Sequence, residues 1–244
     1  MYKFLSCYLF LCLMLYACKG SDGDSLKDPT SEIKIAGAMK DVMRKGKLEG
    51  QLYLDTLKHK EFLQGMGPEA FLKGELLVID GQSYVGRVLT DSTMTILRTF
   101  KVEAPFFVYA YVSEWKKEPL PVTVKSLKDL EKWLEHHRSS SAAPFVFKLT
   151  GSIAKAQIHL QNLPEGTKVS SPKEAHQGQK NYTIQEKEVE ILGFFSKEHQ
   201  GIFTHHDAFT HLHLITKDRT IMGHLDAIEF GDQPIMIYYP ADKH

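Results

Sequence analysis

The sequence predicts an α+β protein whose second half is mostly β-sheet. Helical periodicity is confined to a few short stretches, whereas short apolar runs with strand-like alternation recur along the chain. Between two of these runs stands the pair Asp80-Gly81, which is typical of a tight hairpin. The 244 residues, of which 43% are hydrophobic and 25% charged, are enough for one or two domains with a real core.

The first eighteen residues have the character of an export signal. Lys3 is their one charged residue, and the apolar run from residue 4 to residue 16 is shorter than the roughly 20 residues of a membrane-spanning helix. The run ends in Leu-Tyr-Ala-Cys, which resembles a bacterial lipobox with Cys18 as the lipidated residue. We expect a lipoprotein with a signal peptide at residues 1–18, anchored to the membrane in the periplasm or at the cell surface. The alternative is an uncleaved N-terminal anchor.

Cysteine usage limits the chemistry of the folded part. Cys7 and Cys12 lie inside the predicted leader, and Cys18 is the predicted lipid site. The mature chain would then have no thiol, which excludes a cysteine nucleophile and a cysteine-ligated zinc site. Any metal must be held by histidine and carboxylate side chains.

The folded part is predicted to form two domains. A polar tether at residues 19–32 precedes them. The stretch HHRSSSAAP at residues 136–144 has the composition of an interdomain connection. It separates an N-terminal α/β domain at residues 33–140 from a C-terminal β domain at residues 141–244.

In the N-terminal domain, the spacing of apolar residues predicts helices over residues 33–45, 56–63 and 127–137. Gly65, Gly67 and Pro68 are expected to break the pattern after the second helix. Strands are predicted at residues 76–79, 83–88, 93–98 and 105–112.

The C-terminal domain is predicted to be a run of strands with one polar loop at residues 164–182. The strands are expected at residues 145–149, 153–160, 188–195, 210–215, 221–230 and 235–239.

The charge pattern excludes a nucleic-acid partner. Lys and Arg total 30, as do Asp and Glu, and no segment concentrates basic residues with interleaved aromatic ones.

A histidine-rich hairpin carries the chemistry. Period-two alternation over residues 209–214 places His211 and His213 on one face of a strand. A turn at residues 217–220 then sets His213 opposite His224 and His211 opposite Asp226. Opposed side chains are near enough for imidazoles to share one ion at about 2.0–2.1 Å per Zn–N bond. The hairpin therefore predicts a metal site formed by His211, His213 and His224.

Other polar residues near this hairpin could belong to the site. His205, His206 and Asp207 could be further ligands, partners of the ligands or residues of a lid, and Asp226 could orient His211. Arg87 and Arg219 could face an anionic substrate, although a solvated position is expected for Arg219 at its turn. The other histidines are expected to have ordinary structural roles: His59, His136, His137, His159, His176, His199 and His244.

A histidine-rich strand can also have no function at all. Against this alternative, three desolvated imidazoles without an ion would leave several buried polar nitrogens unsatisfied. We therefore favour the metal site.

The chain resembles the alpha-acetolactate decarboxylase family over nearly the whole predicted mature part. The family's D-G-E-L-I-V-L-D-G-x-x-Y motif is similar to residues 73–84, its T-P-F-A-x-V strand to residues 104–109 and its F-Y-A-I-R-I-D-G strand to residues 145–151. Its G-F-x-x-P-E-x-x-x-G-I pattern resembles residues 193–202, and its H-L-H strand, short turn and histidine-bearing return strand match the hairpin described above.

The resemblance implies a function and a set of roles. Family members convert 2-acetolactate to acetoin and CO2, so the substrate would be a small 2-hydroxy-3-keto acid. His211, His213 and His224 would hold Zn²⁺ or another divalent transition metal. Glu75 matches the family's glutamate near the metal and is the candidate proton donor; the alternative is an exposed glutamate at a strand start. The implied fold has a mixed-sheet N-terminal domain and a mainly antiparallel β C-terminal domain, and the implied assembly is a homodimer.

Three departures from the family pattern keep a second function open. The substrate-contacting arginine of the family's K-T-R-[ST]-V-P segment has no counterpart in residues 158–164, IHLQNLP. The family's C-terminal glutamate is missing, because the corresponding strand offers Tyr238 and Tyr239. The loop at residues 204–207 also differs. The alternative is therefore a metal-binding lipoprotein on the same fold, with an altered substrate or no decarboxylase activity. A purely structural zinc ion, with a closed shell of four ligands, is a third possibility.

Overall fold

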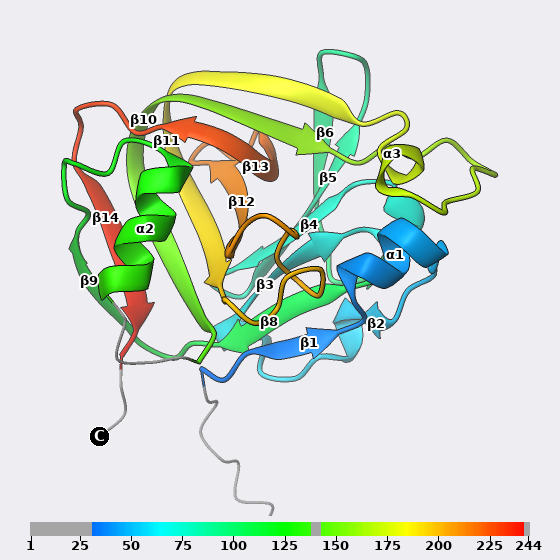
Figure 1. Cartoon of the computed structure of the whole chain (residues 1–244), viewed down its shortest axis with the longest axis horizontal. Coiled ribbons are helices and arrows are strands. Elements are labelled where there is room, and N and C mark those ends of the chain that lie inside the picture. Colours follow the sequence, from blue (N-terminus) through cyan, green and yellow to red (C-terminus); the bar gives the residue numbers. More distant parts are fainter. Residues whose placement is uncertain (1–30, 138–142, 242–244) are drawn as a thin grey trace, which may run out of the picture.

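The computed structural model describes residues 31–137 and 143–241 (Figure 1). The predicted signal peptide and Cys18 lie outside the described residues, as does nearly all of the predicted tether. Within the described ranges, no helix is long and apolar enough to cross a membrane. Two six-stranded sheets form most of the molecule, and three short helices accompany them in the described part. This arrangement confirms the α+β class.

The first sheet is built from the N-terminal part of the chain. Its strands are ordered β1-β8-β3-β4-β5-β6. Their bounds are β1 Lys34–Ala36, β3 Leu63–Pro68, β4 Glu75–Ile79, β5 Gln82–Val88, β6 Met94–Arg98 and β8 Phe107–Tyr111. Every strand pair in it is antiparallel, where a mixed sheet was predicted. A separate two-stranded ribbon joins β2, Leu52–Tyr53, to β7, Glu103–Ala104.

The second sheet is ordered β11-β12-β13-β10-β14-β9, and β11 also pairs with β10. Its strands are β9 Trp115–Pro119, β10 Phe145–Leu160, β11 Lys180–Phe195, β12 Thr210–Thr216, β13 Met222–Glu229 and β14 Ile235–Pro240. One edge of β10 pairs with β11 along its whole length, while the other edge pairs first with β14 and then with β13. Strands β10 to β13 therefore close into a ring, which is visible at the upper centre of Figure 1. Strand β9 joins this sheet although it precedes residue 140.

Three helices are described: α1 Met39–Lys45, α2 Leu127–His137 and α3 Pro172–Ala175. Helix α2 has the predicted bounds, and its Leu130 and Leu134 are fully buried against the second sheet. Helix α1 is shorter than predicted because β1 and Gly37, whose φ is 65°, precede it.

The region after α1 differs most from the prediction. The helix expected at residues 56–63 is replaced by two 3₁₀ turns, Leu54–Thr56 and Lys60–Phe62, followed by β3. Strand β3 runs through the two glycines that were expected to break the pattern. A Cβ atom at Gly65 would lie 2.5 Å from the Phe107 ring, so the absence of a side chain leaves room for side chains of β8 to pack directly over β3.

The two sheets pack against each other through a shared apolar core. Leu77 and Val108 of the first sheet join Phe194, Ile215 and Met222 of the second in one buried cluster. The first sheet thus faces the β11–β12–β13 part of the second, and this contact brings β4 to the histidine-bearing strands.

Gly223 permits the close approach of β13 to β10. A Cβ atom there would lie 2.5 Å from the carbonyl oxygen of His159, so Gly223→Ala should push the two strands apart. We expect this variant to lose about 1–3 kcal/mol of unfolding free energy, measured by urea denaturation. Ala227→Val, at an exposed position of the same strand, is the control and should have little effect. An unchanged unfolding midpoint in Gly223→Ala would show that the strand contact tolerates a methyl group.

Candidate metal centre

Three histidines from two paired strands meet in the interior. His211 and His213 lie on the same face of β12, and His213 is directly opposite His224 of β13, as predicted. Their ring centroids are 5.1 Å apart for His211–His213, 5.1 Å for His211–His224 and 5.6 Å for His213–His224. All three side chains are buried. The hairpin therefore creates a compact, buried group of imidazoles.

These imidazoles are kept neutral and in part unpaired. Nδ1 of His211 and both ring nitrogens of His213 are buried without a well-formed hydrogen bond to any described residue. Burial, reinforced by neighbouring histidines, lowers the pKa of His211 and of His213 well below the usual value. Backbone groups of Phe203 and Leu76 offset these shifts only in part. Burial likewise lowers the pKa of His224 to about 3.

A fourth histidine reaches the group from the loop between β11 and β12. Nε2 of His205 lies 3.0 Å from Nε2 of His224, and the His205 ring centroid is 5.0 Å from that of His224 and 6.2 Å from that of His211. Its neighbours His206 and Asp207 are exposed, with 82% and 74% of their side-chain surface accessible, and lie 3.8 Å from each other. Of the three loop residues considered from the sequence, the structure brings only His205 to the site.

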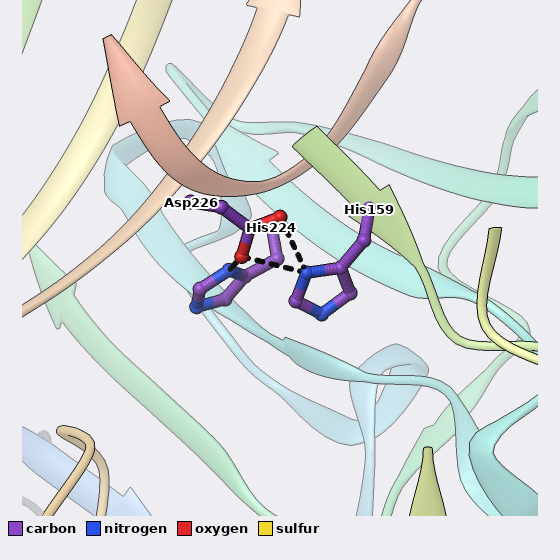
Figure 2. A group of neighbouring side chains, drawn as sticks. All are labelled: His159, His224 and Asp226. Atoms are coloured by element: carbon purple, nitrogen blue, oxygen red, sulfur yellow. Dashed lines mark hydrogen bonds and ion pairs between the residues drawn. The ribbon is translucent and has the colours of Figure 1, made fainter. Parts of the chain in front are cut away.

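Asp226 orients His224 and His159, not His211 (Figure 2). Its carboxylate accepts a hydrogen bond from Nδ1 of His159 at 2.8 Å and lies 3.2 Å from Nδ1 of His224. Burial acts to raise the pKa of Asp226, but the hydrogen bonds to the two histidines outweigh it and lower that pKa below its usual value. The predicted His211–Asp226 pairing was wrong because β13 turns to pair with β10 beyond His224.

His159 was expected to have an ordinary structural role, yet it belongs to this site. It is directly opposite His224 across the β10–β13 pair, and the two rings stack with centroids 4.6 Å apart. His159, His224 and Asp226 also form a group that could itself hold a cation. Figure 2 shows, however, that Asp226 occupies the Nδ1 side of both rings, which leaves their Nε2 atoms facing the other way. This arrangement is typical of a carboxylate that orients metal-binding histidines.

Glu75, at the start of β4, points into the interior. Only 3% of its surface is exposed, and its Oε2 lies 3.6 Å from Nε2 of His213. Burial raises the pKa of Glu75 well above its usual value, the nearby carboxylates Asp226 and Glu69 add to the effect, and a backbone hydrogen bond from Gln161 opposes it. A buried carboxyl group that favours its protonated form therefore stands beside the imidazoles.

A small cavity of about 20 Å³ lies among these side chains, room for roughly one water molecule. Its lining includes Glu75, Gln161, His159 and His176, together with His205, His211 and His224. Gln161 had been given no role from the sequence, and His176 had been expected to have only an ordinary structural one. The signal that could have found Gln161 is its place two residues after His159, since alternate residues of a strand share a face.

The arginines considered from the sequence lie elsewhere. Nε of Arg87 donates to Glu69 at 2.7 Å, and Nη2 of Arg219 donates to Glu190 at 2.8 Å. No lysine or arginine is among the described residues that line the cavity.

The residues present fit a divalent transition metal. Neutral imidazoles with buried, unpaired nitrogens are the ligands that such ions prefer, and each unsatisfied buried nitrogen otherwise costs about 1–3 kcal/mol. His211, His213 and His224 are the strand-borne ligand candidates, and Asp226 would hold His224 in the required orientation.

Comparison with known proteins places the chain in a family. The profile of the family described as alpha-acetolactate decarboxylase matches residues 37–241. An alpha-acetolactate decarboxylase of Lactococcus lactis subsp. cremoris is 29% identical over 185 residues, which cover 74% of this chain and 72% of the relative. One from Brevibacillus brevis is 25% identical over 194 residues, covering 79% and 65%.

Solved structures share the fold. The alpha-acetolactate decarboxylase of Bacillus subtilis strain 168 superimposes with a TM-score of 0.69 at 21% identity, over 87% of this chain and 86% of that one. A Staphylococcus aureus protein of unknown function, described as similar to alpha-acetolactate decarboxylase, gives a TM-score of 0.70 at 19% identity over 86% of each chain. With the family profile spanning nearly all of the described residues, the chain belongs to the alpha-acetolactate decarboxylase family.

Proposed function

We propose that this protein decarboxylates 2-acetolactate to acetoin and CO2 at a metal centre held by His211, His213 and His224. The observation that carries the proposal is the convergence of these three buried imidazoles, two of them with unpaired nitrogens, beside the buried carboxyl group of Glu75. Family membership supports the choice of reaction. We propose zinc as the ion, although this ligand set also suits other divalent transition metals.

The reaction needs a place for an electron pair and a source of one proton. When the carbon–carbon bond to the carboxylate breaks, CO2 leaves and its bonding electrons remain on the substrate as an enolate. A bound divalent metal supplies positive charge beside the oxygen on which this negative charge develops.

Glu75 is our candidate for the proton donor. Because burial favours its protonated form, it can hold a proton until the enolate carbon accepts it, which completes acetoin. The resulting carboxylate must then regain a proton from solvent before the next turnover. The apolar surroundings of Glu75, including Phe106 and Met39, restrict water near the reacting carbon.

A second function on the same fold is favoured by the cavity lining. No lysine or arginine is among the described residues that line the cavity, and Gln161, from the stretch that corresponds to the family's arginine segment, supplies an amide there. An amide is uncharged, so it would bind a carboxylate less strongly than a guanidinium does. The alternative is therefore a metal-binding protein that acts on a different hydroxy-keto acid or has no decarboxylase activity.

Acetoin production separates these two functions. We expect the zinc-loaded protein to form acetoin from racemic 2-acetolactate, and the His211→Ala/His213→Ala variant to form none. Turnover by the parent protein, with none by the double variant, would support the decarboxylase proposal. If the parent binds one zinc ion per chain but releases no CO2 from 2-acetolactate, the decarboxylase proposal is wrong and the alternative is favoured.

The location and assembly proposed for the protein come from the sequence and from the family resemblance. We propose that it is exported and lipid-anchored through Cys18, and that it forms a homodimer. Loss of membrane association in a Cys18→Ser variant would support the lipid anchor.

A further inference from the structure

His205 is set apart from the other three histidines by its origin, because it comes from a loop and not from a strand. Its Nε2 atom nevertheless lies only 3.0 Å from Nε2 of His224, and its ring is nearly perpendicular to the rings of both His211 and His224. Four imidazoles around one tetrahedral ion, with bonds of about 2.0–2.1 Å, have ligand nitrogens roughly 3.3 Å apart and ring centroids about 5 Å apart. His205 has comparable distances to two of the three strand histidines: 3.0 Å between its Nε2 and that of His224, and ring-centroid separations of 5.0 Å from His224 and 6.2 Å from His211.

The segment that precedes His205 in its loop is anchored to α1 and to the core between the sheets. The carbonyl oxygens of Gly201 and Ile202 accept hydrogen bonds of 2.8 Å from the backbone amides of Lys40 and Met39 in α1. Phe203 is fully buried between the two sheets, where the His199 ring stacks on it with centroids 5.0 Å apart. These contacts hold the backbone next to His205 and direct its side chain inward, while His206 faces solvent.

We propose that His205 is a fourth metal ligand, which closes the coordination shell that His211, His213 and His224 would otherwise leave open. This inference rests on the proposed metal centre. Catalytic zinc sites keep one position for water or substrate, whereas closed shells of four protein ligands are typical of structural sites. In this protein, access to the metal would require His205 to leave.

The size of the cavity agrees with a closed shell. About 20 Å³ of free space beside His205 and His224 is too little for a small organic acid. A substrate that binds the metal must therefore displace a side chain. Of the lining side chains in ring contact with His211 and His224, His205 is the half-buried one that lies outside a helix or strand. His205 would then act as a displaceable ligand that admits molecules able to compete with an imidazole.

Cobalt substitution tests this proposal without an activity measurement. Co²⁺ is loaded into the metal-free parent protein, His205→Gln and the matched control His206→Gln, and azide is titrated while the visible spectrum is recorded. Azide needs a free coordination position. We expect His205→Gln to bind azide with an apparent Kd at least about tenfold lower than those of the parent and of His206→Gln. Urea unfolding of all three proteins checks that the loop substitutions leave the fold intact.

The outcomes distinguish the inference from the proposed function. Equal azide affinity in all three cobalt proteins would show that His205 is not a ligand, and that its contact with His224 is only a hydrogen bond. If the parent binds no Co²⁺, the proposed metal centre is wrong and the inference falls with it. If the azide difference is found but no protein forms acetoin from 2-acetolactate, the inference stands and the decarboxylase proposal fails.

Discussion

Glu75→Gln is expected to lower the kcat for acetoin formation by about 10²–10⁴-fold, the usual contribution of a general acid. The amide has nearly the shape of the carboxyl group but cannot give a proton to the enolate carbon. Because the change affects the proton-transfer step, KM should change much less than kcat. Steady-state kinetics of the zinc-loaded variant measure both parameters.

The same substitution is expected to stabilise the metal-free protein at neutral pH. Burial raises the folded-state pKa of Glu75, so its contribution to stability is present below the unfolded pKa and is lost as the pH rises toward the folded pKa. Glutamine removes this loss, so the free energy of unfolding at pH 7.5 should be higher for the variant than for the parent. Exposed Glu61→Gln is the control for both measurements. If Glu75→Gln keeps the kcat of the parent, another group donates the proton. If Glu75→Gln is less stable than the parent, the Glu75 carboxylate has a favourable buried partner.

Acidification from pH 7.5 to pH 5 is expected to destabilise the metal-free protein steeply. His211, His213 and His224 have folded-state pKa values below the usual value, so the unfolded chain binds more protons than the folded one as the pH falls below about 6.5. Each such histidine removes up to about 1.4 kcal/mol of unfolding free energy per pH unit in this range. The stability is therefore fully present above the unfolded pKa and is lost on the acid side.

Urea denaturation of the metal-free protein at several pH values measures this slope. His213→Leu should show a shallower slope, because one buried titrating group is gone and the two unpaired nitrogens of His213 are removed with it. His206→Leu, at an exposed position, should keep the parent slope. The same series in Glu75→Gln removes the opposite contribution of Glu75, whose raised pKa adds stability on acidification. A flat stability profile of that variant between pH 7.5 and pH 5 would mean that the three imidazoles titrate in the folded protein as in the unfolded chain, which would count against their role as metal ligands.

The local elements could be predicted because they depend on residues close in sequence. Alternation along residues 209–214 and a short turn were enough to place His211 and His213 on one face and His213 opposite His224, and the structure has this register. The Asp80-Gly81 hairpin and the amphipathic helix α2 followed from equally local patterns.

The departures in the fold arose where packing overrides local preference. Strand β3 runs through Gly65 and Gly67 because Phe107 of β8 needs the space that a side chain would fill. Strand β9 was missed because its lysines and glutamate do not read as a strand, yet pairing with β14 supplies its hydrogen bonds.

By itself, the sequence determined the hairpin and the histidines that it brings together, because strand periodicity and turn composition act over a few residues. The tertiary structure decided which distant groups join it. Packing of the first sheet on the second brings Glu75 beside His213. Pairing of β10 with β13 brings His159 to the site and directs Asp226 away from His211. The loop anchored on α1 brings His205 to His224. These contacts connect residues far apart in sequence and depend on the complementary shapes of buried surfaces, which no local pattern records.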